Sequence, residues 1–210
     1  MRRTRIKICG ITRAEDAAAA VAAGADAIGV IFAPSVRQVT IAQAAAALAS
    51  VPPPVARVGV FVDAPAEQIL EAVRVCGLTG VQLCGVESPE ECDALPCPVI
   101  KVVHVGTDFC LDMAEPFRAH AAALLLDTHV TGKAGGTSRT FDWHATGGLP
   151  GWAPCFVAGG LSPENVGACV AALRPFAVDV SSGVETSPRI KDHKKIVAFC
   201  AAVRDADQEA

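Results

Sequence analysis

Phe176–Glu185 (FAVDVSSGVE) is an apolar run that ends in a Ser-Ser-Gly turn, and Cys155–Leu161 (CFVAGGL) has the same design one strand and one helix earlier. Glycine lets backbone N–H groups approach an anion without a Cβ in the way, and serine hydroxyls add further donors. When such turns follow the seventh and eighth strands of a (β/α)8 barrel, they form the usual phosphate site of that fold. The number of strands therefore decides both the fold and the site.

Eight short β-rich runs occur along the chain, and Ala-rich, helix-forming segments lie between most of them. The runs are Arg5–Cys9, Ala27–Phe32, Arg57–Val62, Gly80–Leu83, Val99–His104, Ala122–Leu126, Cys155–Ala158 and Phe176–Val180. The expected helices are Ala14–Ala23, Ile41–Ser50, Pro65–Cys76, Pro89–Ala94, Phe109–His120, Pro163–Leu173 and Ile190–Arg204, with a short sixth crossover at Phe141–Gly148 and one long irregular stretch at Thr128–Thr140. Strands that alternate with helices predict a parallel sheet.

The sheet is expected to close. An open doubly wound sheet rarely needs eight near-equal units in 210 residues, and no G-x-G-x-x-G follows the first run, where a dinucleotide-binding fold would carry it. No linker or change of composition divides the chain. We therefore predict an α/β protein made of one (β/α)8 TIM barrel domain over residues 1–210.

Three helix starts carry capping patterns. Thr12-Arg13-Ala14-Glu15 has the form of a capping box, and both Ser88-Pro89-Glu90-Glu91 and Ser162-Pro163-Glu164 place serine at the N-cap and proline at N1.

Composition excludes several classes of protein. A hydrophobic fraction of 51% with 19% charged residues describes a compact globular domain rather than a disordered chain. A net charge of −4, without a basic cluster beyond Arg2-Arg3 and the dispersed C-terminal lysines, predicts neither a nucleic-acid nor a membrane partner. No apolar run reaches the roughly 18 residues of a membrane span, and residues 1–12 form an expected strand rather than a signal peptide. We expect a cytoplasmic protein.

The cysteines and histidines show no metal pattern. The nine cysteines are odd in number and lack a C-x-x-C pair, and the five histidines lack spacings such as H-E-x-x-H. Most of the cysteines are expected to be small buried hydrophobic residues. Neither a disulfide scaffold nor a metal site is predicted.

Cys9 and Asp127 are the strand-end residues best suited to proton transfer, because chemistry in a barrel gathers at the C-terminal ends of strands. A thiol at that end, beside a cation, is expected to have its pKa lowered from about 8.5 toward neutrality and to act as a base or nucleophile. A carboxyl group after three leucines is expected to have its pKa raised, which suits a general acid. The alternatives are a buried strand cysteine and an aspartate that caps a loop.

Taken together, the motifs resemble phosphoribosylanthranilate isomerase over nearly the whole chain and in the same order. They are residues 7–12 (KICGIT), 24–29 (GADAIG), 58–62 (VGVFV), 81–83 (VQL), 125–128 (LLDT), 135–137 (GGT), 141–143 (FDW), 158–166 (AGGLSPENV) and 178–185 (VDVSSGVE). The resemblance implies an aldose–ketose isomerase of tryptophan biosynthesis, which converts N-(5-phosphoribosyl)anthranilate to 1-(2-carboxyphenylamino)-1-deoxyribulose 5-phosphate by an Amadori rearrangement. It implies a small phosphorylated substrate, no metal and no organic cofactor.

The resemblance also assigns residues. Cys9 takes the position of the general base and Asp127 that of the general acid. Gly160, Ser181 and Ser182 are implied to hold the phosphate, with Gly159 and Gly183 shaping the turns. Arg37 matches the arginine that binds the anthranilate carboxylate, and a guanidinium pairs well with such a group.

The chain departs from the family at three places. The loop Phe32–Val39 is short and lacks the usual aromatic residue after Arg37, Cys84 stands where the family commonly has histidine, and residues 136–139 differ from the usual G-T-G pattern. No particular oligomeric state follows from the sequence.

Side-chain parity adds one expectation. Lys7 lies two residues before Cys9 and Asp179 two before Ser181, so each charged residue shares a face with a site residue. The first and last strands are neighbours in a closed barrel. We therefore predict a Lys7–Asp179 ion pair below the site.

Three other functions compete. A bifunctional isomerase of histidine and tryptophan synthesis typically has an aspartate in place of Cys9, and a ribulose-phosphate epimerase would need metal-binding histidines and acids at the strand ends. A catalytically silent phosphate-binding barrel is disfavoured because both Cys9 and Asp127 are present.

Overall fold

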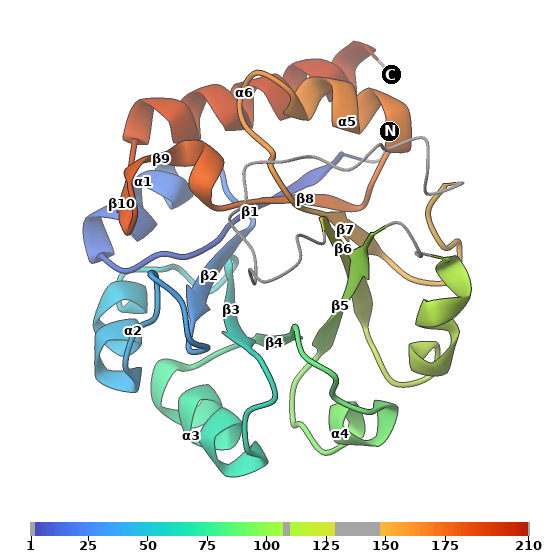
Figure 1. Cartoon of the computed structure of the whole chain (residues 1–210). Coiled ribbons are helices and arrows are strands. Elements are labelled where there is room, and N and C mark those ends of the chain that lie inside the picture. The colour runs from blue at the N-terminus through green and yellow to red at the C-terminus, as the bar shows by residue number, and fades with distance from the viewer. Residues whose placement is uncertain (1–2, 107–109, 129–147, 210) are drawn as a thin grey trace.

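The computed structural model describes residues 3–106, 110–128 and 148–209. Eight strands pair in parallel and in chain order, and the last pairs with the first, so the sheet closes into the predicted barrel (Figure 1). They are β1 (Arg5–Ile8), β2 (Ala27–Ile31), β3 (Ala56–Phe61), β4 (Gly80–Leu83), β5 (Val99–Val105), β6 (Ala123–Thr128), β7 (Cys155–Val157) and β8 (Ala177–Val180).

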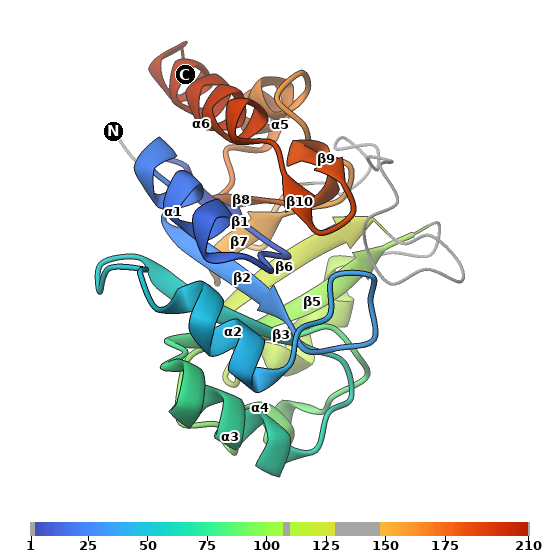
Figure 2. The same ribbon diagram turned by 90° about the vertical axis from the view of Figure 1, so that its left-hand side faces the viewer.

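Helices cover the outside of the barrel, as Figure 2 shows from the side. They are α1 (Ala14–Ala23), α2 (Ile41–Leu48), α3 (Ala66–Cys76), α4 (Pro89–Asp93), α5 (Val166–Leu173) and α6 (His193–Glu209), with the 3₁₀ helices η1 (Leu111–Phe117) and η3 (Ser182–Val184). A short antiparallel hairpin of β9 (Glu185–Ser187) and β10 (Ile190–Lys191) precedes α6.

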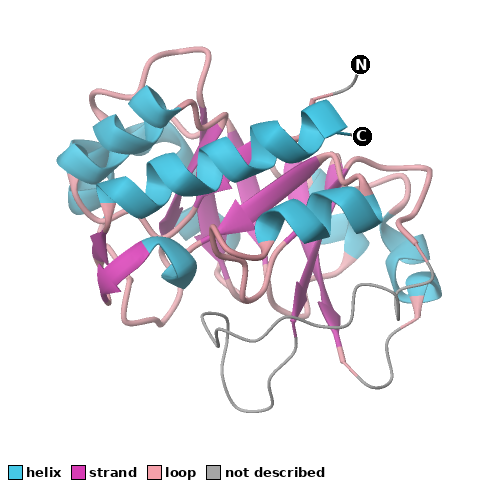
Figure 3. Cartoon of the chain, turned by 90° about the horizontal axis from the view of Figure 1, so that it is seen from above, coloured by secondary structure: helices cyan, strands magenta, loops and turns pink. Residues whose placement is uncertain are grey.

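The last helix, α6, contacts the N-terminal end of the described chain. In Figure 3 α6 lies across the barrel, where it packs against α1 and α5. Asp207 near its end accepts hydrogen bonds from the backbone N and the Oγ1 of Thr4, at 2.8 and 2.7 Å. The barrel is therefore held closed by side chains as well as by the β1–β8 pairing.

Alternation along the strands divides the core into two parts. One face of each strand packs against the helices, and the other face fills the barrel. The interior cluster consists of small and medium apolar side chains, namely Ala27, Val58, Ile100, Val102, Ala123, Leu125, Phe156, Ala158 and Ala177. Polar residues of the interior, such as His104 and Asp127, lie nearer the C-terminal ends of the strands, so the chemistry is confined to one end of the barrel.

Two of the three predicted caps are wrong. The Thr12 hydroxyl donates to the carbonyl of Arg189 at 2.8 Å instead of capping α1. Helix α5 begins at Val166 rather than Pro163, and Ser162 lies in the preceding turn. The Ser88 box is confirmed, because Ser88 accepts from the backbone of Glu91, whose side chain accepts from the backbone of Ser88. At Thr12, a tertiary contact competes for the side chain that would otherwise cap the helix.

Some element boundaries also differ. The expected helix Ile190–Arg204 begins later, because β10 occupies its first residues. The helix expected over Phe109–His120 is the 3₁₀ helix η1, which contains Pro116, and proline cannot donate the backbone bond that an α-helix needs. Strand β6 runs beyond Leu126 and includes Asp127. The irregular stretch expected at 128–140 and the short crossover expected at 141–148 lie outside the described chain, except for residues 128 and 148.

Within the described residues, no helix combines the length and the apolar character that crossing a bilayer requires.

Candidate active site

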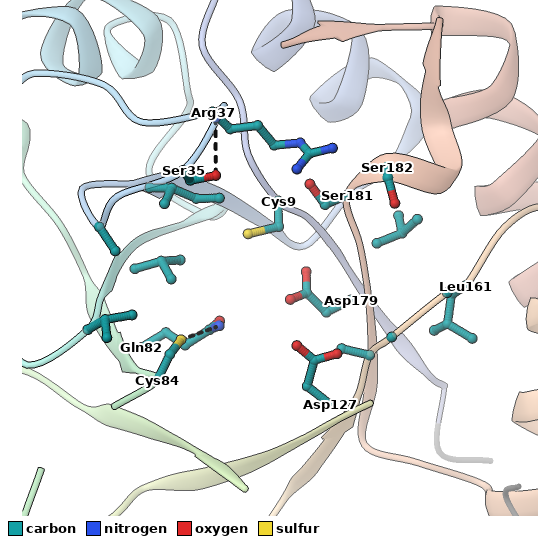
Figure 4. Close-up of a pocket in the computed structure, with 18 of the residues that line it drawn as sticks. Cys9, Ser35, Arg37, Gln82, Cys84, Asp127, Leu161, Asp179, Ser181 and Ser182 are labelled. Atoms are coloured by element: carbon teal, nitrogen blue, oxygen red, sulfur yellow. Dashed lines mark hydrogen bonds between the residues drawn. The ribbon is translucent and has the colours of Figure 1, made fainter. Parts of the chain in front are cut away.

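A cavity opens at the C-terminal ends of the barrel strands, and both predicted proton-transfer residues line it (Figure 4). Its polar lining comes from strands and loops far apart in the chain: Cys9, Ser35, Arg37, Gln82, Cys84, His104, Asp127, Asp179, Ser181 and Ser182. Gly159 and Gly160 form a further part of the wall. The fold thus brings together seven of the eight predicted site residues, while Gly183 lies behind the wall.

Cys9 follows β1 directly and is buried. Its backbone N–H donates to the carbonyl of Val180 at 2.8 Å, which continues the β1–β8 pairing to the cavity. Gly29 on β2 makes room for the thiol, since a Cβ there would lie 2.8 Å from the Cys9 sulfur and 3.2 Å from Lys7 Cε. The GADAIG motif therefore has a packing reason in the site itself.

The expected acidic shift of Cys9 is wrong. Burial raises the pKa of the thiol above its ordinary value. The positive charge of Lys7 opposes this rise, but the negative charge of Asp179 adds to it. Desolvation of the thiolate outweighs the neighbouring cation, because that cation is itself neutralised by its partner.

The predicted Lys7–Asp179 ion pair is confirmed. The two residues are in register across β1 and β8, and Lys7 Nζ lies 2.7 Å from Asp179 Oδ2 and 2.9 Å from Gln82 Oε1. Lys7 is fully buried. Burial by itself lowers the pKa of Lys7, but the charge of Asp179 reverses this and raises it above its ordinary value. The interior of the barrel below Cys9 thus holds a charged pair.

Asp179 also lines the cavity, and one of its carboxylate oxygens has no hydrogen-bond partner in the described chain. Within the described residues, its Oδ1 is the one buried side-chain oxygen or nitrogen that lacks a hydrogen-bond partner. A buried acceptor without a donor is unfavourable, so this oxygen adds to the cost of burying the charged pair.

We expect Lys7→Met to destabilise the protein by about 3–5 kcal/mol, because it leaves the carboxylate of Asp179 buried without its cation. Urea unfolding measures the change. As a control, Arg3→Met removes an exposed partner of Asp26 and should cost no more than about 1 kcal/mol. Equal stability of Lys7→Met and the wild type would show that the buried pair contributes nothing.

Asp127 lies opposite His104 in the pairing of β5 with β6. It reaches the same cavity as Cys9 from another strand, and Figure 4 shows both side chains directed into that space. Gln82 and His104, which the site assignment left out, line it as well. Parity with Cys84, which directly follows β4, was the signal that would have found Gln82.

Cys84 is a thiol that stays protonated near neutral pH. Burial raises the pKa of this thiol to about 12, and Gln82 Nε2 lies 3.3 Å from its sulfur. Near neutral pH the thiol can therefore donate a hydrogen bond, as a protonated group does.

The two glycine-rich turns form one wall of the cavity. Gly159 and Gly160 have φ values of 85° and 64°, in the left-handed region that favours glycine. Asn165 braces this turn, since its Oδ1 accepts from the backbone of Ser162 at 2.8 Å and its Nδ2 donates to the carbonyl of Gly160 at 2.9 Å. The wall is thus set by backbone geometry.

Gly183 is required by a close approach of two loops. A Cβ there would collide with the carbonyl of Leu161 and lie 3.1 Å from Ser162 Cα. We expect Gly183→Ala to destabilise the protein by about 1–3 kcal/mol, because backbone must move to make room. Urea unfolding tests this, and titration with inorganic phosphate should show weaker binding.

The matched control is Gly167→Ala, in α5. A Cβ there has its nearest neighbour 3.8 Å away, and alanine should stabilise the helix by up to about 1 kcal/mol. If both substitutions change the free energy of unfolding by the same amount, the close contact at Gly183 does not destabilise the alanine variant.

Arg37 reaches the cavity wall, but its guanidinium already has a partner. Nε and Nη2 donate to the two carboxylate oxygens of Glu185 at 2.8 and 2.7 Å, and both residues are buried. Burial by itself raises the pKa of Glu185, but the hydrogen bonds from Arg37 and the charge of Lys191 bring it below its ordinary value. No local pattern in the sequence indicates this pair, because its members lie 148 residues apart.

Among the described residues, no cluster of three or more His, Cys, Asp or Glu side chains is arranged to hold a metal ion.

Comparison with known proteins adds independent findings. Residues 6–202 match the family model described as N-(5'phosphoribosyl)anthranilate (PRA) isomerase. The N-(5'-phosphoribosyl)anthranilate isomerases of Pseudomonas fluorescens SBW25 and Desulforamulus reducens are 47% and 45% identical to the chain, over 98% of it and 98% of each relative.

Solved structures agree. The phosphoribosyl anthranilate isomerase of Thermotoga maritima has 39% identity and a TM-score of 0.85, with coverage of 96% of this chain and 99% of that one. A phosphoribosyl anthranilate isomerase in complex with reduced 1-(o-carboxyphenylamino)-1-deoxyribulose 5-phosphate has 38% identity and a TM-score of 0.82, at the same coverage.

Proposed function

Because the chain belongs to the N-(5'-phosphoribosyl)anthranilate isomerase family, an enzyme family of tryptophan biosynthesis, we propose that Asp127 and Cys9 are its acid–base pair. The reaction is the Amadori rearrangement of N-(5-phosphoribosyl)anthranilate to 1-(2-carboxyphenylamino)-1-deoxyribulose 5-phosphate. The observation that supports the assignment is that both residues, from β6 and β1, line one cavity together with the two glycine-rich turns.

Asp127 acts first in this scheme. Its carboxyl group protonates the furanose ring oxygen, the bond from that oxygen to C1 breaks, and the anilino nitrogen supplies the electron pair that forms the iminium. Cys9 then removes the proton from C2, which the adjacent iminium makes acidic, and an enolamine results. The enolamine gains a proton at C1 and loses the one on the C2 oxygen, so the rearrangement balances as an isomerisation.

The raised pKa of Cys9 affects its strength as the base of this reaction. A thiol of raised pKa is a stronger base once it is deprotonated, although it is deprotonated less often. Lys7 and Lys191 both favour the thiolate by their charge. These two lysines thus offset part of the desolvation that burial imposes.

Phosphate is bound, in this proposal, by Gly160, Ser181 and Ser182, with Gly159 and Gly183 shaping the turns. What supports it is the position of the turns on the cavity wall and the left-handed conformation of the first. The ligand of the related structure named above also carries a phosphate. Arg37 is assigned to the carboxylate at the other end of the substrate.

The scheme uses proton transfers alone, so it includes no cofactor. We place the enzyme in the cytoplasm, since all nine cysteines are free thiols, as is usual in a reducing compartment.

The test is the loss of anthranilate-type fluorescence when the purified protein meets phosphoribosylanthranilate generated in situ. We expect rapid loss that is proportional to protein concentration. The reaction without protein measures spontaneous decay of the substrate. Loss no faster than that decay would leave a phosphate-binding barrel without this activity.

A further inference from the structure

The guanidinium of Arg37 already forms an ion pair, with the carboxylate of Glu185. Its hydrogen bonds within the described chain hold the Nε and Nη2 edge against Glu185. Figure 4 shows that the guanidinium end of Arg37 points toward the part of the cavity that is lined by Cys9 and Ser181. The edge that includes Nη1 is the one left for a ligand.

We propose that Glu185 is a positioning residue of this enzyme: it holds Arg37 so that the Nη1 edge meets the carboxylate of the aromatic ring of the substrate. The inference rests on the proposed function for the identity of that carboxylate. Its support comes from three features of the structure.

The first feature is the bidentate geometry. Two short, parallel hydrogen bonds fix both the place and the plane of a guanidinium, which a single bond would leave free to rotate. Arg37 comes from the loop after β2 and Glu185 from the start of β9, so the bond joins segments far apart in the chain.

The second feature is the charge of the cluster. Lys191 is buried, and its Nζ lies 2.9 Å from Glu185 Oε1 and 3.0 Å from the carbonyl of Ser181. Two cations, Arg37 and Lys191, thus share one carboxylate. The excess positive charge in a buried place favours a second anion beside Arg37.

The third feature is the connection to the other end of the cavity. A Cβ on Gly10 would lie 2.6 Å from Arg37 Cδ and 2.8 Å from Ser181 Oγ, so both side chains pack on this one glycine. Through Lys191, Glu185 is joined to Ser181 as well. One chain of contacts therefore sets the carboxylate end relative to the proposed phosphate end.

The experiment compares two substrates, phosphoribosylanthranilate and the phosphoribosyl derivative of aniline, which lacks the carboxylate. For Glu185→Gln we expect kcat/KM with the first substrate to fall about 10- to 100-fold, mainly through KM, because a misplaced contact loses much of its value. With the aniline substrate, the change should stay below about threefold, since no carboxylate is there to meet Arg37.

Two further variants test the route through Arg37. Arg37→Met should give the same selective loss, and the double variant Arg37→Met/Glu185→Gln should be no worse than Arg37→Met, because both act on one contact. Glu67→Gln, on the exposed face of α3, is the matched control and should behave as wild type. If Glu185→Gln folds poorly, Glu185→Asp keeps the charge and should give a smaller loss with the same selectivity.

An equal loss with both substrates would overturn the proposal, because Glu185 would then only support the fold. A lower KM in Glu185→Gln would also overturn the proposal. It would mean that Glu185 competes with the substrate carboxylate for Arg37. Fluorescence titration with anthranilate alone separates the two claims. Weaker binding in Glu185→Gln without any turnover by wild type would support the role of Glu185 and refute the proposed function.

Discussion

Replacement of Asp127 by asparagine is expected to lower kcat by about 10²- to 10⁴-fold, the usual contribution of a positioned general acid. The amide has nearly the same shape as the carboxyl group, so the cavity and its lining should persist. Its N–H groups are far too weakly acidic to protonate the ring oxygen of the substrate. Ring opening would then depend on water.

Steady-state kinetics by the fluorescence assay measures this effect. KM should change by less than about threefold, because the lost interaction exists mainly in the transition state. Asp205→Asn, on the exposed surface of α6, is the control and should retain full activity. If Asp127→Asn keeps a tenth or more of the wild-type kcat, another group supplies the proton.

Replacement of Cys9 by serine should have an effect of similar size, about 10²- to 10⁴-fold in kcat. A hydroxyl fills nearly the same space, but it is far too weak an acid to yield a base near neutral pH. Cys110→Ser, at an exposed position outside the cavity, is the control and should be silent. Full activity of Cys9→Ser would remove the thiol from the mechanism.

The pH profile of the reaction is a separate test of Cys9. Since burial raises the pKa of Cys9, the thiolate is the minor form at neutral pH, and its fraction grows as the pH rises toward that pKa. In Asp127→Asn, where the acid is absent, we therefore expect the residual kcat/KM, corrected for substrate decay, to keep rising from pH 7 to pH 9, by up to about tenfold per pH unit; the wild-type profile should be flatter, because its acid must keep a proton to act. A plateau below pH 7 would mean that the thiol ionises more easily than its burial implies.

The β8 strand and its turn show which features of the structure a local sequence pattern can predict. The apolar run, the Ser-Ser-Gly turn and the two-residue parity of Asp179 and Ser181 placed the strand in the barrel and paired Asp179 with Lys7 correctly. The same pattern could not show why position 183 is glycine. That reason is the carbonyl of Leu161, which belongs to the neighbouring loop.

Capping and ion pairing show where local pattern failed. Thr12 has a capping sequence, yet its hydroxyl bonds the carbonyl of Arg189, 177 residues away. Arg37 is assigned to the substrate carboxylate, and no local pattern indicates that it also bonds Glu185, 148 residues away. Local rules name what a side chain can do, while the neighbours that the fold supplies decide which of its options is used.

The sequence by itself determined the eight-stranded barrel, the end at which the cavity forms and the residues that line most of it, because strand periodicity and turn chemistry are local properties. Only the tertiary structure decided the charge state of Cys9 and the partner of Arg37. Both depend on desolvation and on contacts between distant segments, which exist only once the barrel has closed.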